Sequence, residues 1–174
     1  MNWKQNLLLL SLLSLSPLQA LQSAEMGQEL NSCVLTQLSK NDQNKLEHLE
    51  NKILYLDFWA SWCPPCAKSF SFLNKLHKQY HTEGLVIIAI NLDEVPEDAK
   101  DFLNRYPADF TVDLDFNRQC VKDLGISAMP SSFLVDHNRI IRHIHLGFRS
   151  SQAADLRDQV EQLLSKPLST NTPI

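Results

Sequence analysis

A pair of cysteines separated by two residues follows directly on a buried-strand pattern, and this junction constrains the fold more than any other part of the chain. The strand pattern is Ile53–Trp59, which is mostly apolar. Cys63 and Cys66 then stand where a helix should begin. Pro64 and Pro65 suit the first helical positions, because a missing N–H group costs no hydrogen bond there. The sequence therefore predicts a strand, a short turn and a helix that carries the cysteine pair at its N-terminus.

This position gives the cysteine pair a chemistry of its own. The free N–H groups and the dipole of a helix N-terminus favour a thiolate at Cys63, and the thiolate is the nucleophile of disulfide exchange. Cys66, one turn further on, is placed to attack the mixed disulfide formed at Cys63. A zinc site would need four ligands, whereas Cys33 and Cys120 each stand alone. An inert disulfide across so short a loop would contribute little stability. The pair is therefore predicted to be a redox dithiol.

The ten residues from Asp57 to Cys66 resemble the active-site segment of thioredoxin-like proteins, including Trp62 before the first cysteine. The resemblance implies that Asp57 is a buried carboxylate that takes and returns the proton of Cys66, which is the role of a general base. The alternative is that Asp57 only ends the strand. Because its neighbours are apolar, the carboxyl needs either a partner or a raised pKa.

The first twenty or so residues have the pattern of a secretory signal peptide. Lys4 supplies the basic start, an apolar run follows, and a small residue stands at the break. We expect cleavage after Ala20, with Ala24 as the second choice and a retained N-terminal anchor as the other alternative. The predicted location is the bacterial periplasm, where disulfides persist and reducing equivalents have to be supplied from outside the compartment.

The length and charge of the chain bound its class. Without the signal peptide about 150 residues remain, enough for one domain with its own core. The formal net charge is −4, and this mild acidity argues against nucleic acid and anionic membranes as partners. We divide the chain into a signal peptide or short anchor (1–20), a polar lead-in (21–33), a thioredoxin-like domain (34–165) and a flexible tail (166–174).

Predicted strands and helices alternate along the domain. We expect a front hairpin of Val34–Leu38 and Lys45–Leu49, and strands over Ile53–Trp59, Leu85–Leu92, Phe110–Leu114, Ser132–Val135 and Ile140–Leu146. We expect helices over Cys63–Tyr80, Pro96–Tyr106, Arg118–Leu124 and Ser151–Leu164, the last capped by Ser150 or Ser151. This order predicts an α/β protein with the thioredoxin fold, in which helices flank a central mixed β-sheet. The N-terminal hairpin and a central insert are additions to that fold.

The insert, the front hairpin and the signal peptide resemble those of the exported thioredoxin-like proteins of the TlpA/ResA/CcmG group. The similarity runs from about Val34 to Leu164 and includes the motif Asn91-Leu92-Asp93-Glu94. It implies a monomeric thiol–disulfide oxidoreductase that reduces protein disulfides, uses no cofactor beyond its own cysteine pair, and is recharged by a membrane electron donor of the DsbD/CcdA kind. It further implies a role in the assembly of cytochrome c or cytochrome oxidase.

A second motif is the loop from Gly125 to Pro130, directly before a predicted strand. The thioredoxin fold carries a cis-proline in this loop, so the resemblance implies a cis bond before Pro130 that faces the dithiol. The backbone of Met129 would then pair with an extended substrate segment. The alternative is a trans-proline that merely starts the strand. The predicted substrate-binding surface comprises Trp62, Pro64, Pro65, Met129 and Pro130, and Trp59 either borders it or belongs to the core.

Three further residues are candidates for smaller roles. Glu94 ends a strand on the side where α/β active sites open and could assist proton transfer. Cys33 and Cys120 could form a second, structural disulfide. The strand Leu85–Leu92 holds no lysine to accompany Asp57, so the proton transfer is expected to differ from the usual thioredoxin pattern.

Two other functions are consistent with the cysteine motif. A thiol oxidase or isomerase on the same fold would use the same pair, since the direction depends on how far the thiolate is stabilised. A metallochaperone would hold copper(I) between Cys63 and Cys66, because soft thiolates suit that ion, but no Met-rich tract supports it. His143 and His145 share one strand face and are predicted to be solvated. We predict no metal site.

Overall fold

The computed structural model describes residues 23–30, 49–114, 121, 122 and 124–166. The predicted signal peptide, Cys33, Cys120, most of the predicted helix Arg118–Leu124 and all of the predicted front hairpin except Leu49 lie outside these residues. Leu49 itself lies in a 3₁₀ turn rather than at the end of a strand.

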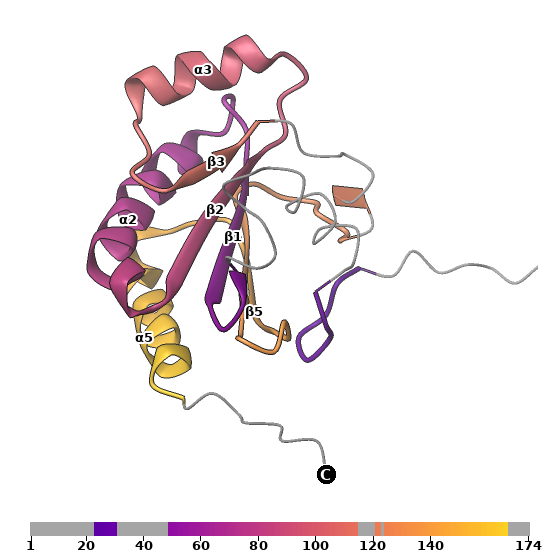
Figure 1. The fold of residues 1–174 in the computed structure, drawn as a ribbon. Coiled ribbons are helices and arrows are strands. Elements are labelled where there is room, and N and C mark those ends of the chain that lie inside the picture. The colour runs from indigo at the N-terminus through magenta and orange to yellow at the C-terminus, as the bar shows by residue number, and fades with distance from the viewer. Residues whose placement is uncertain (1–22, 31–48, 115–120, 123, 167–174) are drawn as a thin grey trace, which may run out of the picture.

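A single mixed sheet of five strands, in the order β3-β2-β1-β4-β5, forms the centre of the described domain (Figure 1). Its strands are β1 (Ile53–Trp59), β2 (Leu85–Asn91), β3 (Thr111–Asp113), β4 (Ser131–Val135) and β5 (Ile141–Leu146). The first three run parallel to one another, whereas β4 runs antiparallel to both β1 and β5. Each strand agrees with its predicted range to within one residue, which confirms the predicted sheet.

The helices begin and end close to the positions that the sequence predicts. They are α2 (Pro64–Tyr80), α3 (Pro96–Arg105) and α5 (Ala153–Leu164). The predicted serine cap of the last helix is wrong, because Gln152 is the N-cap and makes no side-chain capping bond. Ser150 and Ser151 instead form a short 3₁₀ turn, η4 (Ser150–Gln152), so the α-helix begins later than expected.

The strands bury both faces of the sheet. In β1, Ile53, Tyr55 and Trp59 belong to the core beneath α2, α3 and α5, and Figure 1 shows α2 and α5 on the same side of the sheet. The alternate residues of β1 belong to a second core on the other face, in agreement with the two-residue period of a strand. Trp59 is fully buried against Phe70 and Phe102, with ring centroids 4.9 and 4.7 Å away. Trp59 is thus a core residue rather than part of the substrate-binding surface.

The described part of the lead-in, residues 23–30, extends the sheet at the start of β5. Gly27 N–H donates to the carbonyl of Ile141 at 2.8 Å, and Leu30 N–H donates to that of Arg139 at 2.7 Å. A β-bridge joins Glu29 to Ile140. Leu30 is buried in the second core. Among the residues that the structure describes, no helix is long and apolar enough to cross a membrane.

Candidate active site

Cys63 and Cys66 lie at the N-terminus of α2, at the end of the sheet where β1 leaves it. Cys63 is the N-cap residue, with an extended backbone, and prolines occupy the first helical positions. A disulfide joins the two cysteines, whose Cα atoms are 5.4 Å apart. Cys63 is 3% exposed and Cys66 is fully buried. The fold therefore sets Cys63 nearer to solvent than its partner, in the arrangement that a nucleophile and a resolving cysteine require.

Asp57 is 1% exposed and lies on the same face of β1 as Tyr55 and Trp59, which belong to the core that contains both cysteines. Its Oδ1 accepts a hydrogen bond of 3.0 Å from Oγ of Ser132, the residue opposite it on β4. No hydrogen bond to its Oδ2 is found within the described part of the chain. Burial raises the pKa of Asp57 to about 7, against the opposing effect of the hydroxyls of Ser132 and Ser69. A carboxyl with this pKa exchanges its proton readily near neutral pH.

Ser69, on α2, has a hydroxyl that acts on the carboxyl of Asp57. It is buried on α2, one turn after Cys66, and its Oγ donates to the carbonyl of Cys66 at 2.9 Å. Tyr55 also faces Asp57, and its own burial, followed by the charge of Asp57, raises the pKa of its phenol, which therefore stays neutral. The hydroxyls of Ser132 and Ser69 are thus the described groups that lower the pKa of this carboxyl, against the effect of its burial.

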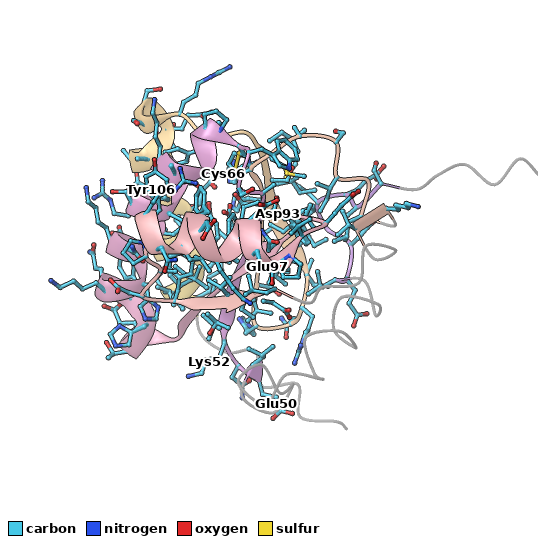
Figure 2. The ribbon with its side chains drawn as sticks, turned by 90° about the horizontal axis from the view of Figure 1, so that it is seen from above. Glu50, Lys52, Cys66, Asp93, Glu97 and Tyr106 are labelled. Atoms are coloured by element: carbon cyan, nitrogen blue, oxygen red, sulfur yellow. A yellow bond between two sulfur atoms is a disulfide. The ribbon has the colours of Figure 1, made fainter. Side chains whose placement is uncertain are left out.

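A polar cluster holds the turn before the cysteines against the end of β2. Asp93 accepts hydrogen bonds from the backbone N–H of Ser61 at 3.0 Å and from its Oγ at 3.1 Å. Asn91 Nδ2 donates to the same carboxylate at 2.8 Å. Figure 2 shows Asp93 in the same part of the view as Cys66, with Lys52, just before β1, on the other side. Asp93 therefore fixes the path of the chain into the helix.

Sequence reasoning missed Asp93, Ser69 and Ser132. The motif Asn91-Leu92-Asp93-Glu94 contains Asp93, but the predicted candidate within it is Glu94. Glu94 is exposed, and its role in proton transfer stays a prediction. The sequence does hold a signal for each serine, because both are polar residues at positions expected to be buried. Ser69 lies on the buried stripe of a predicted helix, and Ser132 begins a predicted strand.

The loop before β4 lies beside the same end of the sheet. The Met129–Pro130 peptide bond is cis, as the resemblance implied. Pro130 is buried, and its carbonyl accepts a hydrogen bond of 2.6 Å from Gly147 N–H. Met129 is half-buried and packs against the core that contains both cysteines. Trp62, immediately before the dithiol, is 67% exposed, so an apolar surface borders the cysteines.

The remaining candidates lie elsewhere. The rings of His143 and His145 on β5 are stacked with centroids 6.2 Å apart, and Nε2 of His145 lies 2.8 Å from Oε1 of Gln159. Among the described residues no group of three or more metal-binding side chains occurs. Cys33 and Cys120 fall outside the described residues, so their pairing stays a prediction.

Comparison with known proteins gives consistent results. Residues 25–163 match the Redoxin family. The chain is 30% identical over 146 residues to the thiol-disulfide oxidoreductase ResA of Bacillus thuringiensis subsp. konkukian, covering 83% of this chain and 80% of that protein. Against ResA of Bacillus anthracis the identity is 33% over 115 residues, 66% of each protein. A crystal structure of the thiol:disulfide interchange protein DsbE from Chlorobium tepidum superposes with a TM-score of 0.65 at 39% identity, covering 68% of this chain and 84% of that one.

Proposed function

This chain belongs to the Redoxin family and is a thiol–disulfide oxidoreductase, and on that premise we propose that it is an exported reductase of protein disulfides. The observation that carries the proposal is the Cys63–Cys66 disulfide at the N-terminus of α2, together with the buried, titratable carboxyl of Asp57 on the preceding strand β1. The helix terminus favours a thiolate on the cysteine nearer to solvent. The buried carboxyl supplies a proton acceptor near the other.

The proposed reaction has two exchange steps. In the reduced protein the Cys63 thiolate attacks one sulfur of the substrate disulfide, forms a mixed disulfide and releases the first substrate thiolate. Asp57 then accepts the proton of Cys66, whose thiolate attacks Sγ of Cys63 and releases the second substrate thiolate. Two electrons have passed to the substrate, and the Cys63–Cys66 disulfide has formed. The buried position of Cys66 keeps its thiol from reacting with solvent oxidants before this step.

The cis-proline loop provides the proposed substrate site. An extended segment of the client would pair with the backbone of Met129, in the manner of strand addition, while Trp62 supplies apolar contact. Pro64 and Pro65 complete this surface, whereas the ring of Pro130, predicted to belong to it, is buried. Disulfides in proteins fit this site better than small-molecule disulfides do, because strand pairing needs a peptide backbone on the client as well as on Met129.

The cellular setting belongs to the same proposal. We assign the protein to the periplasm as a monomer, with a membrane donor of the DsbD/CcdA kind returning electrons to the cysteine pair and with cytochrome c or oxidase assembly as the process served. The resemblance to the TlpA/ResA/CcmG group, which runs from about Val34 to Leu164, supports this assignment. N-terminal sequencing of protein from the exported fraction tests the export step: a start at Leu21 supports cleavage after Ala20, a start at Glu25 supports the second site, and an uncut Met1 supports an anchor.

Reduction of insulin disulfides tests the proposed activity. We expect wild type to be active and Cys63→Ser to be inactive, with Lys78→Ala, at an exposed position of the same helix, as the folding control. Equal rates for wild type and Cys63→Ser would contradict the proposal. The redox potential of the pair then decides the direction: about −270 mV, as in thioredoxin, supports a reductase, whereas about −120 mV, as in DsbA, would make the protein an oxidase.

A further inference from the structure

A cavity of about 330 Å³ lies on the side of α2 that faces the start of α5. These two helices are neighbours on one face of the sheet in Figure 1. The side chains that decide its chemistry are Lys68, Phe72, Lys75, Phe148 and Arg157. The volume falls at the lower end of the range for small-ligand sites, about 300–1,000 Å³, and is enough for two or three side chains of a partner.

The charged side chains that line this cavity are all positive. They are Lys68, Lys75 and Arg157, and no carboxylate of the described residues lines it. The chain as a whole has the opposite balance, with 16 lysine and arginine residues against 20 aspartate and glutamate residues. Within the described ranges none of these three cations forms an ion pair. Their charges are therefore available to an anionic partner, and their fields add over the short width of the cavity.

The wall between these cations is aromatic. The rings of Phe72, from α2, and Phe148, from the loop after β5, lie with centroids 5.4 Å apart and planes inclined by 34°. Both rings are half-buried, so each keeps part of its surface toward solvent. A partner would bind this space most tightly with an apolar side chain against the two rings and negative groups on either side of it.

Two segments that line the cavity also connect to the proposed active site. Lys68 follows Cys66 by two residues on the same helix. Phe148 follows Gly147, which is hydrogen-bonded to the carbonyl of Pro130 at 2.6 Å. A client segment bound at the cis-proline loop can therefore continue along α2 and the chain after Gly147 to reach the cavity. This continuity favours a segment of the client protein over a free small molecule.

We propose that this cavity binds an acidic segment of the client protein, with one bulky apolar residue between two carboxylates, and so selects clients in which such a segment flanks the disulfide. The inference rests on the proposed reductase function and names a class of substrate for it. The carboxylates pair with Lys75 and Arg157 at the rim, and the apolar residue packs on Phe72 and Phe148.

Two disulfide-bridged peptides of equal length test the inference. One carries the flank Glu-Phe-Glu and the other Gln-Phe-Gln, so they differ only in charge. We expect the reduced wild-type protein to act on the acidic peptide roughly fivefold faster in kcat/KM at low salt, the size expected for two exposed ion pairs, with the ratio falling toward one at high salt. The double variant Lys75→Glu/Arg157→Glu should remove or invert the ratio, and the milder Lys75→Gln/Arg157→Gln should bring it to about one.

Lys78→Glu is the matched control, because Lys78 is an exposed lysine of the same helix that does not line the cavity. It should keep the wild-type ratio. A wild-type ratio of one, or a ratio that Lys75→Glu/Arg157→Glu leaves unchanged, would overturn the inference even if insulin is reduced normally. If wild type reduces neither insulin nor either peptide, the proposed function itself fails. Binding of cysteine-free forms of the two peptides to the oxidised protein then tests the cavity alone. Equal affinity for the acidic and the neutral peptide would reject the inference.

Discussion

Replacing Asp57 by asparagine should stabilise the oxidised protein at alkaline pH and change its stability much less in acid. The carboxyl is buried and accepts one hydrogen bond, from Ser132, while no donor to its Oδ2 occurs in the described chain. Its ionised form is therefore poorly solvated in the folded state, but fully solvated in the unfolded one. Asparagine keeps the shape of the side chain and removes the charge.

The magnitude follows from the shift in the pKa of Asp57. Burial raises this pKa from its ordinary value of 3.8 to about 7. Below the lower value both folded and unfolded chains are protonated. Between the two values the folded state alone holds the proton, so the free energy of unfolding falls as pH rises, by about 1.36 kcal/mol per pH unit. Above about pH 7 the loss is complete, at about 4 kcal/mol.

Urea unfolding of oxidised wild type and Asp57→Asn, from about pH 4 to about pH 9, measures this effect. The difference in unfolding free energy between the two proteins is the useful quantity, because the other ionisable groups cancel in it. It should grow through the acid range and level off near neutral pH. Asp101→Asn, an exposed carboxylate of α3, serves as the control. A difference for Asp57→Asn that does not vary with pH would refute the reasoning.

Three other substitutions probe the surroundings of the dithiol. Ser132→Ala removes the donor to Oδ1 of Asp57 and should raise the pKa of Asp57 further. The difference in unfolding free energy between the Ser132→Ala protein and the same protein with Asp57→Asn should therefore level off at a higher pH than it does for wild type. A difference that levels off at the wild-type pH would contradict this. Phe70→Ala removes a fully buried ring from the aromatic cluster and should cost about 3–5 kcal/mol in urea unfolding, and a loss below about 1 kcal/mol would show that the site collapses. Asp93→Ala leaves the turn at Ser61 without its acceptor and should cost about 1–3 kcal/mol, whereas Asp93→Asn, which keeps an acceptor oxygen, should cost less.

The parts of the fold that follow from local pattern were predicted from the sequence. The apolar runs Ile53–Trp59 and Leu85–Asn91 have the length and composition of strands buried on both faces, and the structure confirms them. The prolines after Cys63 located the start of its helix to within one residue. The cap of the last helix was missed because Ser150 and Ser151 serve equally well in a 3₁₀ turn, and the choice depends on packing rather than on local preference.

The surroundings of the dithiol were less predictable because they depend on register. Ser132 partners Asp57 through an antiparallel alignment that neither segment specifies alone. Asp93 and Glu94 are chemically similar neighbours, and only the turn of the chain beyond β2 decides that Asp93 reaches Ser61. The cysteine pair itself was recognisable because its chemistry depends on a spacing of three residues, which the sequence displays directly.

The bridge between Glu29 and Ile140 bears on how this protein behaves in concentrated solution. The outer strands of an open sheet carry unpaired backbone groups, which can recruit strands from other molecules and start aggregation. On one side β3 is only three residues long. On the other side the lead-in occupies the start of β5, and the polar side chains Arg142, His143 and His145 follow along that strand. The lead-in therefore contributes to colloidal stability, since without it the start of β5 would be open to strands of neighbouring molecules.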